Sequence, residues 1–223
     1  MRPRTITPGI YMLTAACGLI DAATFLALGG VFAEIMTGNI MFLAFDIGQG
    51  GGWEVVPRFL VPLVTFSLGA VVCGFLLMSP RFGTRRRHPF VVIAVFVAIA
   101  TILALLWNPG SESTEAMIVV GVLSFAMGLQ NAAVLYHAVP DVATNVMTLT
   151  LTALLAESRL GEGSRANVLR RVMSIACFFS GGVIAAALVH FGTVYPLGLA
   201  ALLYALAIVP LILGEKPQQE RTA

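Results

Sequence analysis

Eight apolar runs follow one another along this chain, with short polar segments between them. They fall at about residues 9–29, 33–48, 57–79, 89–107, 115–137, 141–157, 168–190 and 194–213. Charged residues make up only 11% of the sequence, whereas a soluble globular domain carries roughly 25%. Six of the runs are long enough for a helix to cross a hydrocarbon core about 30 Å thick. The sequence therefore predicts an all-α polytopic membrane protein, with a single membrane domain over residues 1–223.

The runs at 33–48 and 141–157 are shorter, and each follows a helix-breaking pair, Gly29-Gly30 or Pro140-Asp141. Lys and Arg favour the cytoplasmic side of a membrane. If all eight runs cross, one of two clusters must face outward: Arg81 with Arg85, Arg86 and Arg87, or Arg159 with Arg165, Arg170 and Arg171. If the two short runs are re-entrant and the N-terminus is inside, only Arg58 among the Lys and Arg residues lies outside. We therefore predict six spans, two short re-entrant segments and cytoplasmic N- and C-termini. Crossing by all eight runs is the alternative.

A polar signature occurs twice, about half a chain length apart. The first copy is Gly18-Leu19-Ile20-Asp21-Ala22-Ala23 and then Met36-Thr37-Gly38-Asn39; the second is Gly128-Leu129-Gln130-Asn131-Ala132-Ala133 and then Met147-Thr148-Leu149-Thr150. Further along, Phe66-Ser67-Leu68-Gly69 matches Phe179-Ser180-Gly181-Gly182. With three crossings in each half, the second half enters the membrane from the opposite side. We predict an inverted-topology repeat over about residues 8–108 and 115–214, followed by a disordered tail at 215–223. Transporters built in this way bind their solutes near the midplane.

Asp21 lies near the middle of the first run. An ionised carboxylate at the bilayer centre costs about 2.5–3.5 kcal/mol and normally faces a partner or a water-filled cavity. Its counterpart in the second copy is the neutral Asn131. One interpretation is a proton- or cation-handling carboxylate opposite an amide that orients a ligand. The other is a buried polar pair that locks two spans together.

The motif Thr37-Gly38-Asn39 combines a hydroxyl, an amide and a backbone that can come close to a ligand. In a re-entrant segment these groups would line a polar cavity, and the positive end of a helix pointing into it would favour an anionic or carbonyl-bearing solute. The alternative is tight helix packing. The second copy keeps the hydroxyls but has Leu149 in place of the glycine. The predicted substrate-binding residues are Asp21, Thr37, Gly38, Asn39, Asn131, Thr148 and Thr150, with Glu34 and Gln130 as a possible entrance or gate.

Other kinds of chemistry have no matching pattern in the sequence. Cys17, Cys73 and Cys177 lie within apolar runs without metal-ligand spacing, and the arginines sit in short connections. We therefore expect no bound metal, cofactor or nucleic acid, and no enzymatic activity. Small residues four apart, such as Gly69 with Cys73 or Gly182 with Ala186, permit close helix approach within the repeat or between subunits. A homo-oligomer is therefore possible.

The chain resembles the YoaK-like family of bacterial inner-membrane proteins, a domain of unknown function. The resemblance rests on Gly18-x-x-Asp21-Ala22, on Phe32 followed by Met36-Thr37-Gly38-Asn39, and on Gly128-Leu129-Gln130-Asn131-Ala132. It extends from about residue 8 to residue 213 and implies a location in the bacterial inner membrane, without implying a substrate. The family usually shows Thr-Gly-Thr where this chain has Thr148-Leu149-Thr150, so the resemblance implies unequal use of the two halves.

These observations predict a transporter or channel for an unknown small solute, surrounded by the lipid bilayer. A membrane scaffold or regulatory partner is the main alternative, and it predicts a dry, packed centre with no cavity around Asp21. A membrane-embedded enzyme is the weakest alternative, because no catalytic constellation is recognisable.

Overall fold

The computed structural model describes residues 3–78, 88–137, 147–156 and 165–213, and these residues form eight helices. In chain order they are α1 (Pro3–Ala27), α2 (Met36–Gly48), α3 (Val56–Met78), α4 (His88–Trp107), α5 (Thr114–His137), α6 (Met147–Ala156), α7 (Arg165–Val189) and α8 (Val194–Leu213). Each helix coincides with one of the predicted apolar runs. The predicted arginine-rich connection at 81–87, Arg159 and the tail at 215–223 lie outside the described residues.

Five helices are long and apolar enough to cross a membrane, namely α1, α3, α4, α5 and α7. The chain is therefore an all-helical, multi-pass membrane protein. The predicted sixth span corresponds to α8, whose described apolar stretch at Val194–Pro210 is shorter. The total of six spans stays a prediction.

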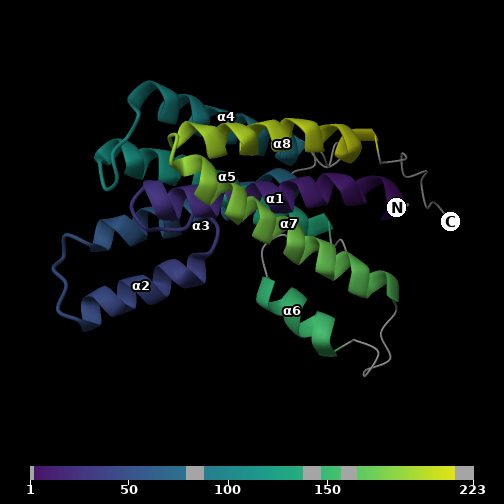
Figure 1. Ribbon diagram of the computed structural model, residues 1–223, viewed down its shortest axis with the longest axis horizontal. Helices are drawn as coiled ribbons and strands as arrows, with labels where there is room; N and C mark the ends of the chain where they lie inside the picture. Colours follow the sequence, from purple (N-terminus) through teal and green to yellow (C-terminus); the bar gives the residue numbers. More distant parts are fainter. Residues whose placement is uncertain (1–2, 79–87, 138–146, 157–164, 214–223) are drawn as a thin grey trace.

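Helices α1 and α5 form the centre of the bundle. In each of them 61% of the membrane-span residues are buried, against 22% in α3 and α4 and 17% in α7. Helix α1 packs mainly against α7 and α8, α5 packs mainly against α3 and α4, and α4 also contacts α8 (Figure 1). The outer helices turn large apolar side chains such as Phe75, Leu106 and Phe179 outward. In a membrane protein this surface faces lipid.

Glycines set the closest crossings of the bundle. A Cβ atom built on Gly18 of α1 would overlap the backbone oxygen of Phe178 in α7, and one on Gly128 of α5 would overlap that of Phe66 in α3. The approach is reciprocal, because Gly181 lies against Ala15 and Gly69 lies against Phe125 in the same manner. Such small-residue contacts bring helix backbones together where lipid supplies no hydrophobic drive.

The two crossings pair Phe66 with Phe178 and Gly69 with Gly181. The sequence match instead paired Gly69 with Gly182, one residue further along. The side-chain position of Gly182 does not face the crossing, since a Cβ built on it would meet no described atom of another helix within 4 Å. Apart from the one-residue shift, the α1–α7 and α5–α3 crossings use the same kinds of contact.

The two short helices lie apart from each other at one side of the bundle. At about 1.5 Å per residue, the 13 residues of α2 and the 10 residues of α6 extend roughly 20 Å and 15 Å. Helix α2 packs against α3, and α6 packs against α7. In Figure 1 both begin near the middle of the molecule and run toward opposite ends.

Candidate functional site

Asp21 lies buried at the point where α2 begins. After α1, Gly29 and Gly30 take φ values of 106° and 68°, which glycine adopts easily, and residues 33–35 then lie against α1. The Asp21 Oδ1 atom accepts a hydrogen bond from the backbone N–H of Glu34 at 2.8 Å, and the amides of Ala33 and Ile35 lie nearby. The sequence predicted an anionic or carbonyl-bearing solute at such a helix N-terminus. In the structure the Asp21 carboxyl group itself lies there.

Glu34 joins Asp21 to the second half of the chain. Its side chain is only 6% exposed, deeper than an entrance residue would lie. The Oε1 atom accepts a hydrogen bond from Nδ2 of Asn131 at 3.1 Å, and the same amide donates to the backbone oxygen of Met127. Asn131 therefore reaches Asp21 only through Glu34. Burial, and then the neighbouring Asp21 carboxylate, raise the pKa of Glu34, which lies in the connection between α1 and α2.

Both carboxyl groups keep one oxygen atom without a partner. Among the described residues, no hydrogen-bond donor reaches Oδ2 of Asp21 or Oε2 of Glu34, and both atoms are buried. An unpaired buried acceptor costs about 1–3 kcal/mol. The two oxygens can therefore accept a proton or contribute to a small cation site. Within the described residues, His, Cys, Asp and Glu form no group of three that could hold a metal ion.

Gln130 extends this buried cluster to α8. Its Nε2 atom donates a hydrogen bond to the Cys17 sulfur at 2.9 Å, and its Oε1 accepts one from the Tyr204 hydroxyl. The Cys17 thiol also lies close to the Glu34 carboxyl group. We call the group Cys17, Asp21, Glu34, Gln130, Asn131 and Tyr204 the central polar cluster. In the sequence, Cys17 was noted only as a cysteine within an apolar run, and Tyr204 was not among the predicted site residues. The signal that could have indicated Tyr204 is its hydroxyl group inside the apolar run at 194–213.

Asn39 and Gly38 pack against Phe32 and stabilise the connection before α2. Asn39 is fully buried, and its amide both accepts a hydrogen bond from the Phe32 N–H at 2.9 Å and donates one to the Phe32 carbonyl at 2.7 Å. A Cβ on Gly38 would lie 2.8 Å from the Phe32 ring, which stacks on Phe25 with centroids 4.8 Å apart. Thr37 is exposed on the first turn of α2.

The predicted residues of the second half lie on α6. Thr148 is exposed and Thr150 is buried, and the main contacts of α6 are with α7. There, Arg171 of α7 donates a hydrogen bond to the backbone oxygen of Ala153 at 2.8 Å. No hydrogen bond between described residues joins Thr148 or Thr150 to the central polar cluster. The structure thus groups Asp21, Glu34, Gln130 and Asn131, and leaves the threonines outside that group.

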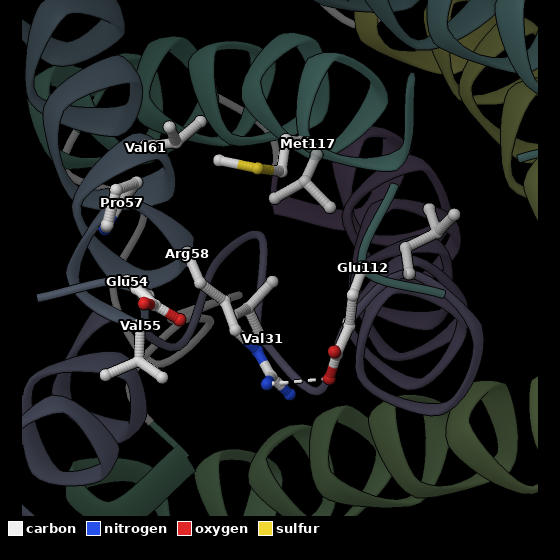
Figure 2. Close-up of a pocket in the computed structure, with 11 residues that line it drawn as sticks. Val31, Glu54, Val55, Pro57, Arg58, Val61, Glu112 and Met117 are labelled. Atoms are coloured by element: carbon white, nitrogen blue, oxygen red, sulfur yellow. Dashed lines mark hydrogen bonds and ion pairs between the residues drawn. The ribbon is translucent and has the colours of Figure 1, made fainter. Parts of the chain in front are cut away.

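A cavity of about 270 Å³ lies where the end of α1 meets the start of α3 and of α5. Its wall includes Leu28, Val31, Glu54, Arg58, Glu112 and Met117. Arg58 crosses it to form an ion pair with Glu112, with 2.8 Å between Nη1 and Oε1 (Figure 2). Asp21 and residues 37–39 are not part of its wall. The predicted topology has Arg58 on the outer side of the membrane; a cavity shared by Arg58, Glu54 and Glu112 was not predicted.

Comparison with known proteins gives a family and one relative. A family model described as "Protein of unknown function (DUF1275)" matches residues 9–210. The UPF0700 transmembrane protein YoaK of Bacillus subtilis (strain 168) is 27% identical over 153 residues, which cover 66% of this chain and 65% of that protein. No solved structure matches the chain.

Proposed function

The chain belongs to the family of proteins of unknown function named DUF1275, which confirms the YoaK-like resemblance, and we propose that it is a small-solute transporter or channel rather than an enzyme. We assign proton or cation handling to Asp21 and Glu34. Asn131 holds Glu34, and Gln130 joins the cluster through Cys17 and Tyr204. Of the residues predicted from sequence, Asn39 and Gly38 keep a structural role in this proposal.

The observation that carries the proposal is the pair of buried carboxyl groups, each with one oxygen that no donor in the described part of the chain reaches. A pair that only locked helices together would be expected to satisfy all of its oxygens, because an unpaired acceptor in a buried site opposes folding. Buried ionisable groups in membrane proteins commonly belong to ion pathways or proton relays. The contact from Glu34 to Asn131 also ties the pair to both halves of the chain.

The arrangement of the helices supports an inverted repeat. In such a repeat, α1, α2, α3 and α4 correspond to α5, α6, α7 and α8. The contact of α1 with α7 then corresponds to that of α5 with α3, α1 with α8 to α5 with α4, and α2 with α3 to α6 with α7. All six pairs are in contact. The matched glycine contacts at the first two crossings follow the same exchange. In transporters with such repeats, the site lies at the interface of the halves, where the central polar cluster lies in this chain.

Re-entrance of α2 is supported by the cavity at the ends of α1 and α3. Leu28, directly after α1, and Arg58, in the first turn of α3, line the same cavity. The chain therefore leaves α1 and enters α3 at the same end of the bundle, with α2 between them. With the N-terminus inside, this end is outside, and the predicted arginine clusters and both termini are cytoplasmic in a bacterial inner membrane.

A membrane scaffold is the second candidate, and one observation favours it. The described cavity does not reach Asp21, and Asn39 bonds only within its own connection and helix. In the transporter proposal, this arrangement is the closed state of a site that opens in another conformation.

Transport assays with Asp21→Asn test the proposal. Purified protein is reconstituted into liposomes that enclose a pH-sensitive dye, and a panel of small metabolites is added outside. Some solute should change the internal pH with the wild-type protein. Asp21→Asn and Glu34→Gln should each lower that pH change at least tenfold while the protein stays folded. The Thr37→Ala variant is the control, since Thr37 is exposed and outside the cluster; it should transport normally.

Two results would contradict this assignment. If Asp21→Asn leaves solute-dependent proton movement unchanged, the carboxyl pair does not handle the proton. If no solute in the panel moves across the membrane, the scaffold alternative gains support.

A further inference from the structure

Arg58 occupies a cavity whose side-chain charges are not balanced. The cavity holds one arginine, Arg58, and two acidic residues, Glu54 and Glu112. Figure 2 shows Arg58 reaching Glu112 on one side, with Glu54 on the other. The Nε atom of Arg58 is buried and has no hydrogen-bond partner among the described residues. The side chain as a whole is 32% exposed. A guanidinium group presents its donors as a planar fork that matches a carboxylate, so the accessible donors of Arg58 can bind a carboxylate.

The acidic side chains suit a positive group on the same ligand. Glu112 uses one oxygen for Arg58 and is 63% exposed, while Glu54 lines the cavity from the connection before α3. Glu112 adopts a φ of +66°, a conformation that residues other than glycine rarely take. The loop before α5 therefore presents this carboxylate to Arg58 in an unfavourable backbone conformation.

The remaining wall and the volume limit the size of the ligand. Val31, Val61, Met117 and Val120 give the cavity an apolar side. Since pockets for drug-sized ligands have volumes of about 300–1,000 Å³, a cavity of about 270 Å³ suits a smaller solute. A dicarboxylate would place a second negative charge beside Glu54 and Glu112, and a simple amine would bring no acceptor to Arg58.

We propose that this cavity binds a small zwitterion, an amino-acid-like solute whose carboxylate contacts Arg58 and whose ammonium group lies near Glu112 and Glu54. The apolar wall contacts the ligand's side chain. The inference rests on the proposed function in one respect: if the protein is a transporter, this cavity is the outer entrance of its transport pathway. Binding itself requires no transport.

Calorimetric titration of the full-length protein in detergent tests the proposal. The probes are glycine, L-valine and L-leucine, each with its matched acid and amine; for L-valine these are 3-methylbutanoate and 2-methylpropan-1-amine. At least one amino acid should bind, and its acid and amine should each bind at least tenfold more weakly. The proposal is overturned if none of the three amino acids binds, or if either analogue binds as tightly as the amino acid.

Variants locate the binding. Arg58→Gln and Glu112→Gln should each weaken binding at least tenfold, and Arg58→Lys should recover part of the affinity because it keeps the charge without the fork. Glu115→Gln is the matched control, since Glu115 lies in the first turn of α5 and is not part of the cavity wall; its affinity should equal that of the wild type. If Arg58→Gln does not fold, Glu112→Gln decides. Unchanged affinity in folded Arg58→Gln or Glu112→Gln overturns the proposal.

The outcomes separate this inference from the proposed function. Asp21→Asn should bind the amino acid normally in detergent, because Asp21 is not part of the cavity wall, while losing proton-linked transport in liposomes. Amino-acid binding without transport would support the proposed binding site and contradict the proposed transporter function. Transport of a solute without amino-acid binding would support the transporter function and overturn the proposed binding site.

Discussion

Asn39 shows how one polar side chain in apolar sequence can be used entirely for folding. Its amide pairs with both the N–H and the C=O group of Phe32 in the connection before α2. Because a membrane interior offers no water to such groups, a residue with both a donor and an acceptor at this position is favoured. The side chain holds the turn that brings Glu34 to Asp21.

We expect Asn39→Ala to destabilise the protein by about 1–3 kcal/mol, because it leaves the N–H and C=O groups of Phe32 unpaired. Thr37→Ala, two residues away on an exposed position, should change stability by no more than about 0.5 kcal/mol. Unfolding of both variants in detergent, followed by circular dichroism, measures the difference. Equal stability of the two variants would show that the contacts of Asn39 with Phe32 do not matter.

The composition of the central polar cluster was only partly predictable from the sequence. Asp21 and Asn131 are evident because each is a polar residue inside a long apolar run. The placement of Glu34 between them depends on the positive φ angles of Gly29 and Gly30, which turn the chain back toward α1. Tyr204 joins from α8 through Gln130, and a contact between residues so distant in sequence follows from packing alone.

Helices were the most predictable elements of the fold. Apolar runs of about 20 residues correspond to one helix each, because backbone groups in lipid must be satisfied within the segment. The register of helix pairs was less predictable. Gly181 and Gly182 are chemically identical neighbours, and only the rotation of α7 decides which one faces Ala15 of α1.

This difference between adjacent glycines gives a prediction for the α1–α7 crossing. Gly181→Ala should destabilise the protein by about 1–3 kcal/mol, because the added methyl group overlaps the backbone of Ala15 and α7 must move outward. Gly182→Ala meets no described atom within 4 Å and should be neutral or stabilising by up to about 1 kcal/mol, since alanine is the better helix former. Unfolding in detergent compares the two variants. The reverse order would restore the register predicted from sequence.

At the scale of the whole molecule, packing brings together three segments for which the charge pattern predicts the same side of the membrane. The Arg58–Glu112 ion pair joins the start of α3 to the loop between α4 and α5, and the end of α1 lines the same cavity. These three segments therefore share one end of the bundle. The positive-inside rule predicts that the same segments lie outside, since they hold Arg58 alone among the Lys and Arg residues of the sequence.

Cysteine labelling in intact cells distinguishes six spans from eight. Trp53→Cys, at a position 88% exposed in the connection between α2 and α3, should react with a membrane-impermeant maleimide in intact cells, whereas Arg85→Cys should react only after lysis. The wild-type chain is the background control, because it carries Cys17 and Cys73, which are fully buried, and Cys177, which is partly exposed. If all eight helices cross, α2 carries the chain back inside and the two positions exchange sides. A Thr5→Cys variant fixes the side of the N-terminus in the same assay. Labelling of Arg85→Cys in intact cells, with Trp53→Cys and Thr5→Cys labelled only after lysis, would show that α2 spans the membrane and would remove the re-entrant segment from the proposed transport site.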